Sequence, residues 1–443
     1  MKSKPYPEYK DSGVEWIGKI PENWNTGLLK RFSDNITDGS HFSPETVEDG
    51  KHYITVRDLT EKDIDFENAK KVSETDFASL KRNGCQPKVG DVILSKDGTI
   101  GKCIVVRTND FVALSSLGLI TPKNNLNPHY LRYYLISDDN VSQMYSFIRG
   151  SALKRLTINL INNLRIIVPP YEHQMKIVNF LDKKTSEIDL TIEKDTLLIE
   201  LLKEKRTALI NHVVTKGLDP TVKMKDSGVE WIGEIPEDWN ARKLKLFVSK
   251  IGSGITPRGG ASVYVEEGIA LLRSQNVHFD GLRLKDVSYI TEEINKTMLN
   301  SVVKNKDVLL NITGASIGRC TYFENHVDKA NVNQHVCIIR PEKIFHRFLN
   351  YVLMSNIGQD QIFSTQMGSS REGVNFEQIG NFIITCPPYE QQKDIANYLD
   401  KSTKKIDLTI KKIQENISLL EEYKNSLIHH LVTGKVDVRE VAV

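Results

Sequence analysis

A glycine-rich turn in the first half of the chain places a lysine where a phosphate-binding loop would carry one. The turn reads Gly98-Thr-Ile-Gly101-Lys102-Cys103, and its counterpart in the second half reads Gly314-Ala-Ser-Ile-Gly318-Arg319-Cys320. A P-loop needs a glycine five residues before Gly101, where Lys96 stands, and a Ser or Thr after the lysine. Because neither copy meets these requirements, we expect β-turns that bring backbone groups and one basic side chain to the surface.

The segments Val168-Pro-Pro-Tyr171 and Cys386-Pro-Pro-Tyr389 are similar to the Asp/Asn/Ser-Pro-Pro-Tyr signature of amino-methyltransferases. In that signature the first side chain accepts a hydrogen bond from the adenine amino group. Valine has no side-chain acceptor and cysteine is a weak one, and no glycine-rich turn for S-adenosylmethionine accompanies either copy. We interpret both segments as a proline stop between a strand and a long helix.

Other catalytic patterns are absent from the sequence. It contains no His-x-Glu-x-x-His, no paired-carboxylate nuclease spacing and no Gly-x-Ser-x-Gly, and its 11 histidines form no ligand cluster. The five cysteines are scattered without a C-x-x-C pair, which argues against a disulfide framework or a thiolate zinc site and fits a reducing cytosol. We therefore expect a reader rather than an enzyme, with no cofactor and no metal.

Polar residues suited to binding nucleic acid recur at four loop positions in both halves. In the first half they are Ser40, His41, Arg57, Lys96, Thr99, Lys102, Arg149, Lys154 and Arg155. In the second half they are Thr256, Arg258, Arg273, Gln275, Thr313, Ser316, Arg319, Gln366 and Arg371. Hydroxyl, Arg and Lys groups bond phosphates, whereas Arg, Asn and Gln also bond guanine or adenine edges. For any single residue, a role as a plain polar turn remains open.

Two long helices must position these loops. Apolar residues recur at steps of three, four or seven from 169 to 213, and the pattern returns 218 residues later. The first seam comprises Ile177, Leu181, Ile188, Ile192, Ile199, Leu202, Leu209 and Val213, and the second comprises Ile395, Leu399, Ile406, Ile410, Ile417, Leu420, Leu427 and Leu431. Neither helix can bury such a stripe alone, so we expect the two helices to pack against each other.

A near-identical segment precedes each block of loops. Residues 10–25 read KDSGVEWIGKIPENWN, and residues 225–240 read KDSGVEWIGEIPEDWN. All four tryptophans lie in these copies, where we expect them to anchor the segment on the following domain. The tail after the second helix is similar to the start of the middle linker, which predicts a pseudo-twofold molecule whose chain ends lie close together.

The predicted fold class is α+β, with two globular β-rich domains separated by two long antiparallel helices that form a coiled-coil spacer. We divide the chain into residues 1–168 and 218–386, each a linker segment with a β-rich domain, and the helical regions 169–217 and 387–443. Strands are expected at 52–57, 91–95, 101–107, 164–168, 269–273, 307–311, 318–323, 336–340 and 382–385, and short helices at 130–136 and 345–354. Outside the framework, the two blocks diverge strongly in sequence. One scaffold thus carries two different sets of loops.

Composition places the chain among ordinary globular proteins, and 443 residues allow two or three domains. A net charge of only +2 does not by itself indicate a nucleic-acid partner, although a local basic patch is compatible with it. The polar N-terminus does not resemble a signal peptide, and no apolar run approaches the roughly 20 residues that cross a bilayer. We expect a cytoplasmic protein.

The repeated segment and the Pro-Pro-Tyr-Glu-x-Gln helix starts at 169–182 and 387–400 together resemble the DNA specificity subunit of type I restriction-modification systems. The resemblance implies a non-catalytic subunit of a phage-defence system with two target recognition domains, each reading one half of a bipartite site in double-stranded DNA. It also implies two modification subunits that methylate adenine from S-adenosylmethionine, docked on the spacer, and restriction subunits that translocate DNA with ATP and cleave it. One departure is His173, which stands where Gln391 stands in the second copy.

Three alternatives remain open at this point. A fused methyltransferase or nuclease is disfavoured by the missing cofactor loop and carboxylate pairs. A coiled-coil adaptor that binds only proteins would explain the helices but not the two divergent blocks. An orphan or truncated specificity protein that no longer assembles has the same sequence features as a working subunit.

Overall fold

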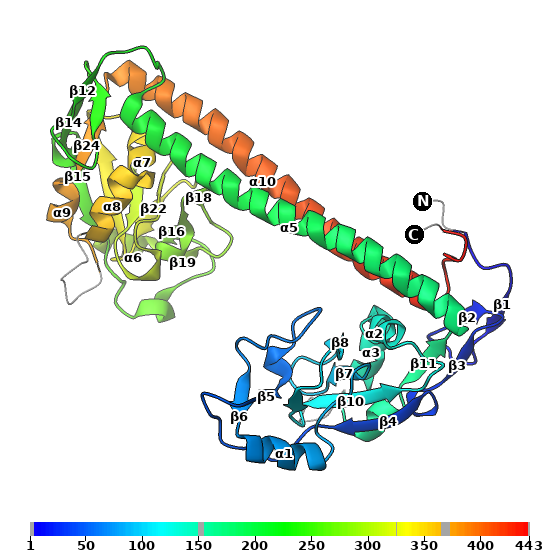
Figure 1. The fold of residues 1–443 in the computed structure, drawn as a ribbon. Helices are drawn as coiled ribbons and strands as arrows, with labels where there is room; N and C mark the ends of the chain where they lie inside the picture. Colours follow the sequence, from blue (N-terminus) through cyan, green and yellow to red (C-terminus); the bar gives the residue numbers. More distant parts are fainter. Residues whose placement is uncertain (1–3, 149–154, 325, 365–372, 442–443) are drawn as a thin grey trace. The chain divides into compact units, whose positions relative to one another are not determined.

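The computed structural model describes residues 4–148, 155–324, 326–364 and 373–441. They form two compact units (Figure 1). Unit 1 comprises Met1–Asp195 with Gln414–Val443, and unit 2 comprises Thr196–Ile413. Each unit therefore combines one β-rich domain with the first part of the helix that follows it and the last part of the helix of the other repeat.

Unit 1 contains two main sheets. A four-stranded antiparallel sheet has the order β4-β10-β7-β8, and a three-stranded sheet has the order β6-β5-β9. In the latter, β5 runs parallel to β9 and antiparallel to β6. The strands are β1 (Tyr9–Asp11), β2 (Lys19–Pro21), β3 (Asn25–Leu28), β4 (Ser33–Asp38), β5 (Lys51–Ile54), β6 (Lys70–Val72), β7 (Val92–Ser95), β8 (Cys103–Val105), β9 (Phe111–Ala113), β10 (Leu117–Pro122) and β11 (Arg165–Val168).

The short helices of unit 1 are α1 (Glu74–Arg82), α2 (Pro128–Leu135), α3 (Asp138–Phe147) and α4 (Ile158–Asn162), with the 3₁₀ turns η1 (Leu29–Arg31) and η2 (Val56–Asp58). Helix α1 packs on the three-stranded sheet, and α2 and α4 pack on the four-stranded sheet. Pro128 follows the cap residue Asn127, whose side chain accepts from two backbone N–H groups at the start of α2. The core residues Leu131, Leu135 and Ile167 are completely buried beside the start of α5.

Unit 2 repeats this layout, with sheets ordered β15-β23-β20-β21 and β19-β16-β22. Its strands are β12 (Met224–Asp226), β13 (Glu234–Pro236), β14 (Asn240–Lys243), β15 (Val248–Ser253), β16 (Ile269–Leu272), β17 (Val277–His278), β18 (Gly281–Leu282), β19 (Ser288–Ile290), β20 (Val308–Asn311), β21 (Cys320–Tyr322), β22 (Ala330–Val332), β23 (Val336–Pro341) and β24 (Ile383–Cys386). Its short helices are α6 (Glu292–Thr297), α7 (His346–Met354), α8 (Asn356–Ser364) and α9 (Phe376–Gly380), with η3 (Leu244–Leu246), η4 (Gly260–Val263), η5 (Ser274–Asn276), η6 (Leu299–Ser301) and η7 (Gly314–Ser316).

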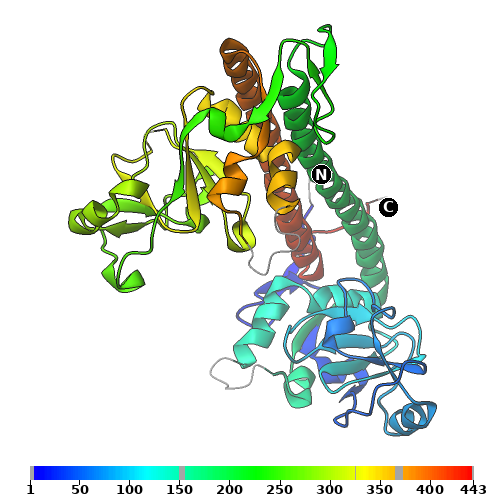
Figure 2. The same ribbon diagram turned by 90° about the vertical axis from the view of Figure 1, so that its left-hand side faces the viewer.

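The long helices are α5 (Tyr171–Lys216) and α10 (Tyr389–Val432), and Figure 2 shows each from a second side as an uninterrupted helix. None of the predicted seam residues is exposed. In unit 1 Lys424 of α10 donates to Asp189 of α5 at 2.8 Å, and in unit 2 Arg206 of α5 donates to Asp407 of α10 at 3.0 Å. Within each unit the two helical segments thus run antiparallel, and the two ion pairs are repeat equivalents 218 residues apart.

The Pro-Pro-Tyr-Glu-x-Gln segments serve as clamps at the helix starts. Gln174 is completely buried, and its Nε2 donates to the carbonyl of Pro169 at 2.8 Å while its Oε1 accepts from the N–H of Asn127 at 2.7 Å. Gln392 repeats this arrangement with Pro387 and the N–H of Phe345. The motif therefore joins strand, long helix and short helix, a structural role that accounts for its recurrence.

The four tryptophans divide into two buried and two exposed residues, so the expectation that all four are anchors was half wrong. Trp24 and Trp239 are 0% and 1% exposed, whereas Trp16 and Trp231 are 42% and 58% exposed. The buried pair packs under the glycine that ends a long helix, because a Cβ on Gly434 would lie 3.1 Å from Trp24 and one on Gly217 would lie 3.2 Å from Trp239. Trp16 and Trp231 lie instead in the exposed turns of the β1–β2 and β12–β13 hairpins.

The prediction that the chain ends lie close together is confirmed for the described residues. Lys4 and Asp437 form an antiparallel β-bridge, and the Tyr9 hydroxyl donates to the Gly434 carbonyl at 3.0 Å. Figure 1 shows the two end segments running together within unit 1. No helix among the described residues is long and apolar enough to cross a membrane.

Candidate nucleic-acid interface

In unit 1 three of the predicted loop positions converge on one turn, Leu114–Ser116, which joins β9 to β10. Ser115 N–H donates to the Ser40 carbonyl at 2.8 Å, and Lys96 N–H donates to the Ser116 carbonyl at 2.9 Å. Leu114 N–H donates to the carbonyl of Ile54, the last residue of β5, at 2.9 Å. The ends of β4, β5 and β7 are therefore held around this turn, which we call the central turn of unit 1.

Unit 2 has an equivalent central turn, Asn333–His335, between β22 and β23. Gly254 N–H donates to the Asn333 carbonyl at 3.1 Å, Asn333 N–H to the Leu272 carbonyl at 3.2 Å, and Ile312 N–H to the His335 carbonyl at 3.0 Å. Neither central turn was predicted from the sequence. Their only local signal is a short polar pair between two apolar runs, Ser115-Ser116 in one unit and Gln334-His335 in the other.

Two glycines let the first loop pass over the neighbouring strand. A Cβ on Gly39 would lie 2.1 Å from the Ala113 carbonyl oxygen, and one on Gly254 would lie 1.6 Å from the Val332 carbonyl oxygen. Both distances are shorter than any tolerated contact, so only glycine fits where the backbones meet. These contacts place the loops after β4 and β15 against their central turns.

Two side chains of unit 1 that the sequence suggested as DNA contacts point into the domain. Lys96 is only 1% exposed, and its ammonium lies 3.2 Å from the carboxylate of Asp38, since a buried charge needs a partner. The Ser40 hydroxyl is buried and donates to the Phe42 carbonyl at 2.6 Å. We therefore remove both from the expected DNA contacts and assign them to holding the loop, a correction that linear sequence could not supply.

The residues left at this edge of unit 1 are exposed and polar. His41 lies 3.1 Å from Asp38, and the exposed Arg155 lies 3.1 Å from Asp97. Asp97 and Arg155 also form a backbone bridge, which brings the fourth loop position to the third. Each of these two side chains is held by a carboxylate and stays exposed.

At the matching edge of unit 2, Thr256 and Thr313 come together around the central turn. Thr313 Oγ1 lies 2.6 Å from Nδ1 of His335, and the Thr256 hydroxyl donates to Gln334 Oε1. Arg273 follows β16 directly, and its guanidinium lies 5.5 Å from the ring centre of Tyr264. The ring orients the arginine, as cation–π contacts do.

The remaining predicted residues fall into three groups. Exposed side chains are those of Arg57 in η2, Gln275 in η5, and Thr99 and Arg258 in loops. Half-buried ones are those of Lys102, Ser316 and Arg319. Lys102 Nζ donates to the Leu59 carbonyl at 2.7 Å, so it ties two loops together. Arg149, Lys154, Gln366 and Arg371 lie outside the described residues.

No group of metal-binding side chains occurs among the described residues. All five cysteines carry free thiols, and burial raises the pKa of Cys103 to about 12. A thiol with such a pKa stays protonated and is a poor nucleophile near neutral pH.

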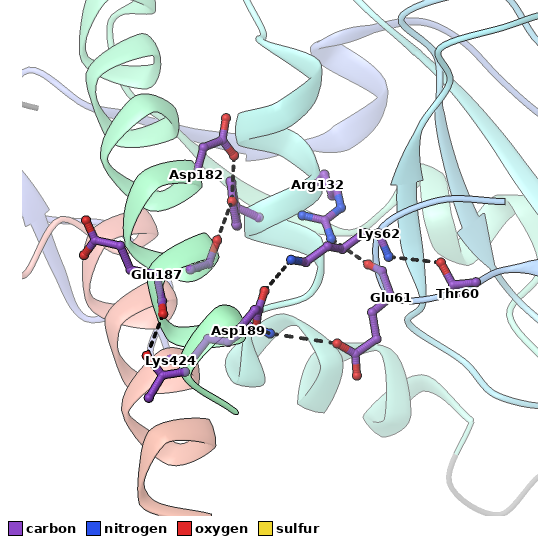
Figure 3. Close-up of polar contacts among 11 residues, drawn as sticks. Thr60, Glu61, Lys62, Arg132, Asp182, Glu187, Asp189 and Lys424 are labelled. Atoms are coloured by element: carbon purple, nitrogen blue, oxygen red, sulfur yellow. Dashed lines mark hydrogen bonds and ion pairs between the residues drawn. The ribbon is translucent and has the colours of Figure 1, made fainter. Parts of the chain in front are cut away.

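A polar cleft of about 690 Å³ in unit 1 connects the β-rich domain to the long helices. Figure 3 shows its floor, where Asp189 of α5 bonds Lys424 of α10 at 2.8 Å and Lys62 of the loop after η2 at 2.5 Å. Arg132 of α2 donates to the Glu61 carbonyl at 2.7 Å, which fixes the same loop. Because these contacts join α2, α5, α10 and the loop after η2, the cleft is a junction between elements.

A second junction occurs in both units. The Tyr133 hydroxyl donates to Asp182 at 2.7 Å and lies 3.3 Å from Thr185, and Tyr351, Asp400 and Thr403 repeat these distances. Burial, with a smaller contribution from the neighbouring carboxylates, raises the pKa of both tyrosines far above its usual value. They remain neutral donors that fasten α2 and α7 to the long helices.

Two similar units, each presenting loops of different chemistry on one framework, define a class of internally duplicated α+β proteins. The chain belongs to the type I restriction modification DNA specificity domain family, whose model matches residues 21–201 and 236–418. The two matches correspond to two target recognition domains, which we call recognition domain 1 and recognition domain 2.

Curated relatives carry names from the same family. The chain is 27% identical over 356 residues to the Type I restriction enzyme MjaVIII specificity subunit of Methanocaldococcus jannaschii, covering 79% of this chain and 80% of that one. It is 21% identical to the EcoBI specificity subunit of Escherichia coli, covering 97% and 90% of the two chains.

Two solved structures share the fold. A chain from a study of complex assembly and conformational transition of the type I R-M system matches with a TM-score of 0.71 and 15% identity, covering 94% of this chain and 99% of that one. The HsdS subunit from Thermoanaerobacter tengcongensis matches with a TM-score of 0.56 and 16% identity, covering 96% and 100%.

Proposed function

We propose that each recognition domain reads one half of a bipartite sequence in double-stranded DNA through the loops around its central turn. The observation that carries this proposal is the pairing of one backbone framework with two side-chain sets. The loops of recognition domain 1 present His41 and Arg155, and those of recognition domain 2 present Thr256 and Gln334. Positive, hydroxyl and amide groups of this kind supply phosphate and base-edge contacts.

The long helices have two roles in this proposal. They set the length of DNA left unread between the half-sites, because α5 and α10 each pass without interruption from one unit into the other. They also dock two modification subunits, which would transfer methyl to adenine, and the larger complex would include ATP-driven restriction subunits.

Exposed apolar residues at repeat-equivalent positions support two copies of one partner. Leu190 of α5 and Leu408 of α10 are each 51% exposed, and Leu201 and Leu419 form a second exposed pair. Each pair is separated by 218 residues. A repeated exposed surface that adds nothing to the core of either unit is suited to binding the same protein twice.

Mapping adenine methylation across a genome with and without this chain tests the proposed function. We expect the chain to add methylation at one bipartite motif with a constant gap when modification subunits of its own system are present. Equal methylation maps in the two cells would contradict a role in specifying DNA sites.

A further inference from the structure

A chain of hydrogen bonds crosses three loops at the edge of recognition domain 2. The Thr256 hydroxyl donates to Gln334 Oε1, Gln334 Nε2 donates to His335 Nε2 at 3.0 Å, and His335 Nδ1 lies 2.6 Å from Thr313 Oγ1. Gln334 is exposed, whereas His335 is half-buried. An exposed amide is thus fixed at both of its polar atoms by neighbours from within the domain.

The hydrogen bonds link the protons of the three side chains. With Gln334 Nε2 as the donor, His335 Nε2 is the acceptor, so the ring proton lies on Nδ1 and is donated to Thr313 Oγ1. The turn beneath is itself held, since His335 N–H donates to Asn333 Oδ1 at 3.1 Å. Gln334 therefore stands on a rigid support at the centre of the predicted DNA-reading edge.

Each polar atom of the Gln334 amide can form one further hydrogen bond. A carboxamide has two lone pairs on oxygen and two N–H donors on nitrogen, and the internal contacts occupy one of each. What remains is one acceptor beside one donor. That pair is complementary to the N6 amino group and N7 of adenine in the major groove.

We propose that Gln334 reads one adenine in the half-site of recognition domain 2, with Thr256 and His335 as positioning residues. This inference rests on the proposed DNA-reading function and adds the reading residue and the base. Because the amide is already held in place before binding, less conformational entropy is lost when DNA binds than with a flexible side chain.

Recognition domain 1 offers a built-in contrast. Ser115 and Ser116 occupy the equivalent turn, so no long amide projects from it. The same framework position therefore carries an adenine-reading group in one domain only. A change at Gln334 is expected to alter one base pair of one half-site and to leave the other half-site untouched.

The test is selection from a library of randomised duplexes by the full-length chain assembled with modification subunits, comparing wild type with Gln334→Ala. We expect wild type to enrich a bipartite sequence and Gln334→Ala to lose about tenfold to a hundredfold of discrimination at one A·T pair. Thr256→Val should lose less at the same pair, because the amide persists but is less well oriented. Gln334→Glu should shift preference there toward cytosine, whose amino group a carboxylate accepts.

The outcomes separate the two claims. If wild type enriches no bipartite sequence, the proposed function fails and this inference with it. If wild type enriches one and Gln334→Ala leaves every position unchanged, only the assignment of Gln334 is overturned. A uniform loss of binding to all sequences by a variant with unchanged thermal unfolding would make Gln334 a backbone contact, which also overturns base reading.

Discussion

At the scale of single residues, the two repeats differ in how the indole N–H of their buried tryptophan is hydrogen-bonded. In unit 2 Trp239 Nε1 donates to Gln391 at 2.8 Å, whereas Trp24 Nε1 is buried without a hydrogen-bond partner among the described residues. His173 occupies the position of Gln391, and burial lowers the pKa of its imidazole, with the charge of Arg439 adding to the effect. Recognition domain 1 thus contains a buried indole N–H of Trp24 without an acceptor, whereas the equivalent N–H of Trp239 in recognition domain 2 has one.

His173→Gln is predicted to give Trp24 the missing acceptor. An added buried hydrogen bond contributes about 1 kcal/mol, and an unpaired buried donor costs a similar amount, so we expect the free energy of unfolding to rise by roughly that much. Urea denaturation of both chains measures it. The reverse change, Gln391→His, should destabilise, and equal stability of all three chains would contradict the assignment.

Gly254→Ala is predicted to disrupt the reading edge of recognition domain 2. The new Cβ would meet the Val332 carbonyl oxygen at 1.6 Å, so the loop must move, at a cost of about 1–3 kcal/mol. Gly252→Ala, two residues earlier in β15, is the matched control, because the nearest neighbour of Gly252 is the flexible Lys250 side chain at 3.7 Å. Thermal unfolding and DNA selection should separate the two variants, and similar behaviour would argue against a close-packed loop.

The residues that we propose to read DNA were only partly predictable from the sequence. Loop composition indicated Thr256, Arg273 and Thr313 because their residue types suit DNA. It could not show that Lys96 is buried beside Asp38, because that contact joins residues far apart in the sequence. It also missed Gln334, whose setting depends on three loops meeting at one turn.

At the scale of elements, the junction at Asp189 joins three segments of unit 1. Burial alone raises the pKa of Asp189, but hydrogen bonds and charge from Lys424 and Lys62 outweigh it and hold the pKa below its usual range. A carboxylate with a lowered folded-state pKa stabilises the fold above its unfolded pKa of about 4, and this contribution disappears as the pH falls through the folded-state pKa.

Asp189→Asn is therefore predicted to lower stability at pH 7 by about 1 kcal/mol, a value reduced by solvent screening. The difference from wild type should begin to shrink below about pH 4 and disappear once the pH falls below the lowered folded-state pKa of Asp189, where both chains carry a neutral group. Denaturant unfolding across this pH range measures it. Asp407→Asn, whose partner in unit 2 is Arg206, is the matched control without the contact to Lys62. A difference that persisted at acid pH would exclude charge as its cause.

Element prediction succeeded where the pattern was local. The seams predicted both long helices, and apolar runs predicted β7, β20 and β23 close to their observed bounds. The sequence analysis missed β10 although it lies between β4 and β7, because Gly118 interrupts its apolar run. A side chain at Gly118 would crowd Ile161 of α4 at 3.1 Å, so the glycine reflects packing that only the fold reveals.

At the scale of the whole molecule, each unit is completed by a helix end from the other repeat. The Tyr130 hydroxyl donates to the Val432 carbonyl in unit 1, and the Thr385 hydroxyl donates to the Val214 carbonyl in unit 2. The family match covers two recognition domains. Both have the same backbone framework because the chain is an internal repeat.

Inserting seven residues into each long helix, after Asp195 and after Ile413, tests the spacing role. The two sites are repeat equivalents, and seven residues preserve the seam while adding about 10 Å at 1.5 Å per residue. We expect methylation mapping to find both half-sites unchanged and the unread gap longer by up to about three base pairs, at roughly 3.4 Å each. An unchanged gap would refute the role of the helices as spacers.

The central claim is that each recognition domain reads its own half-site, and exchange of one domain tests it most directly. Residues 26–168 are replaced by the corresponding block of another specificity subunit, and adenine methylation is mapped for the chimera and the parent. We expect one half of the bipartite motif to change while the other half and the gap stay the same. A change in both halves, or in neither, would contradict it.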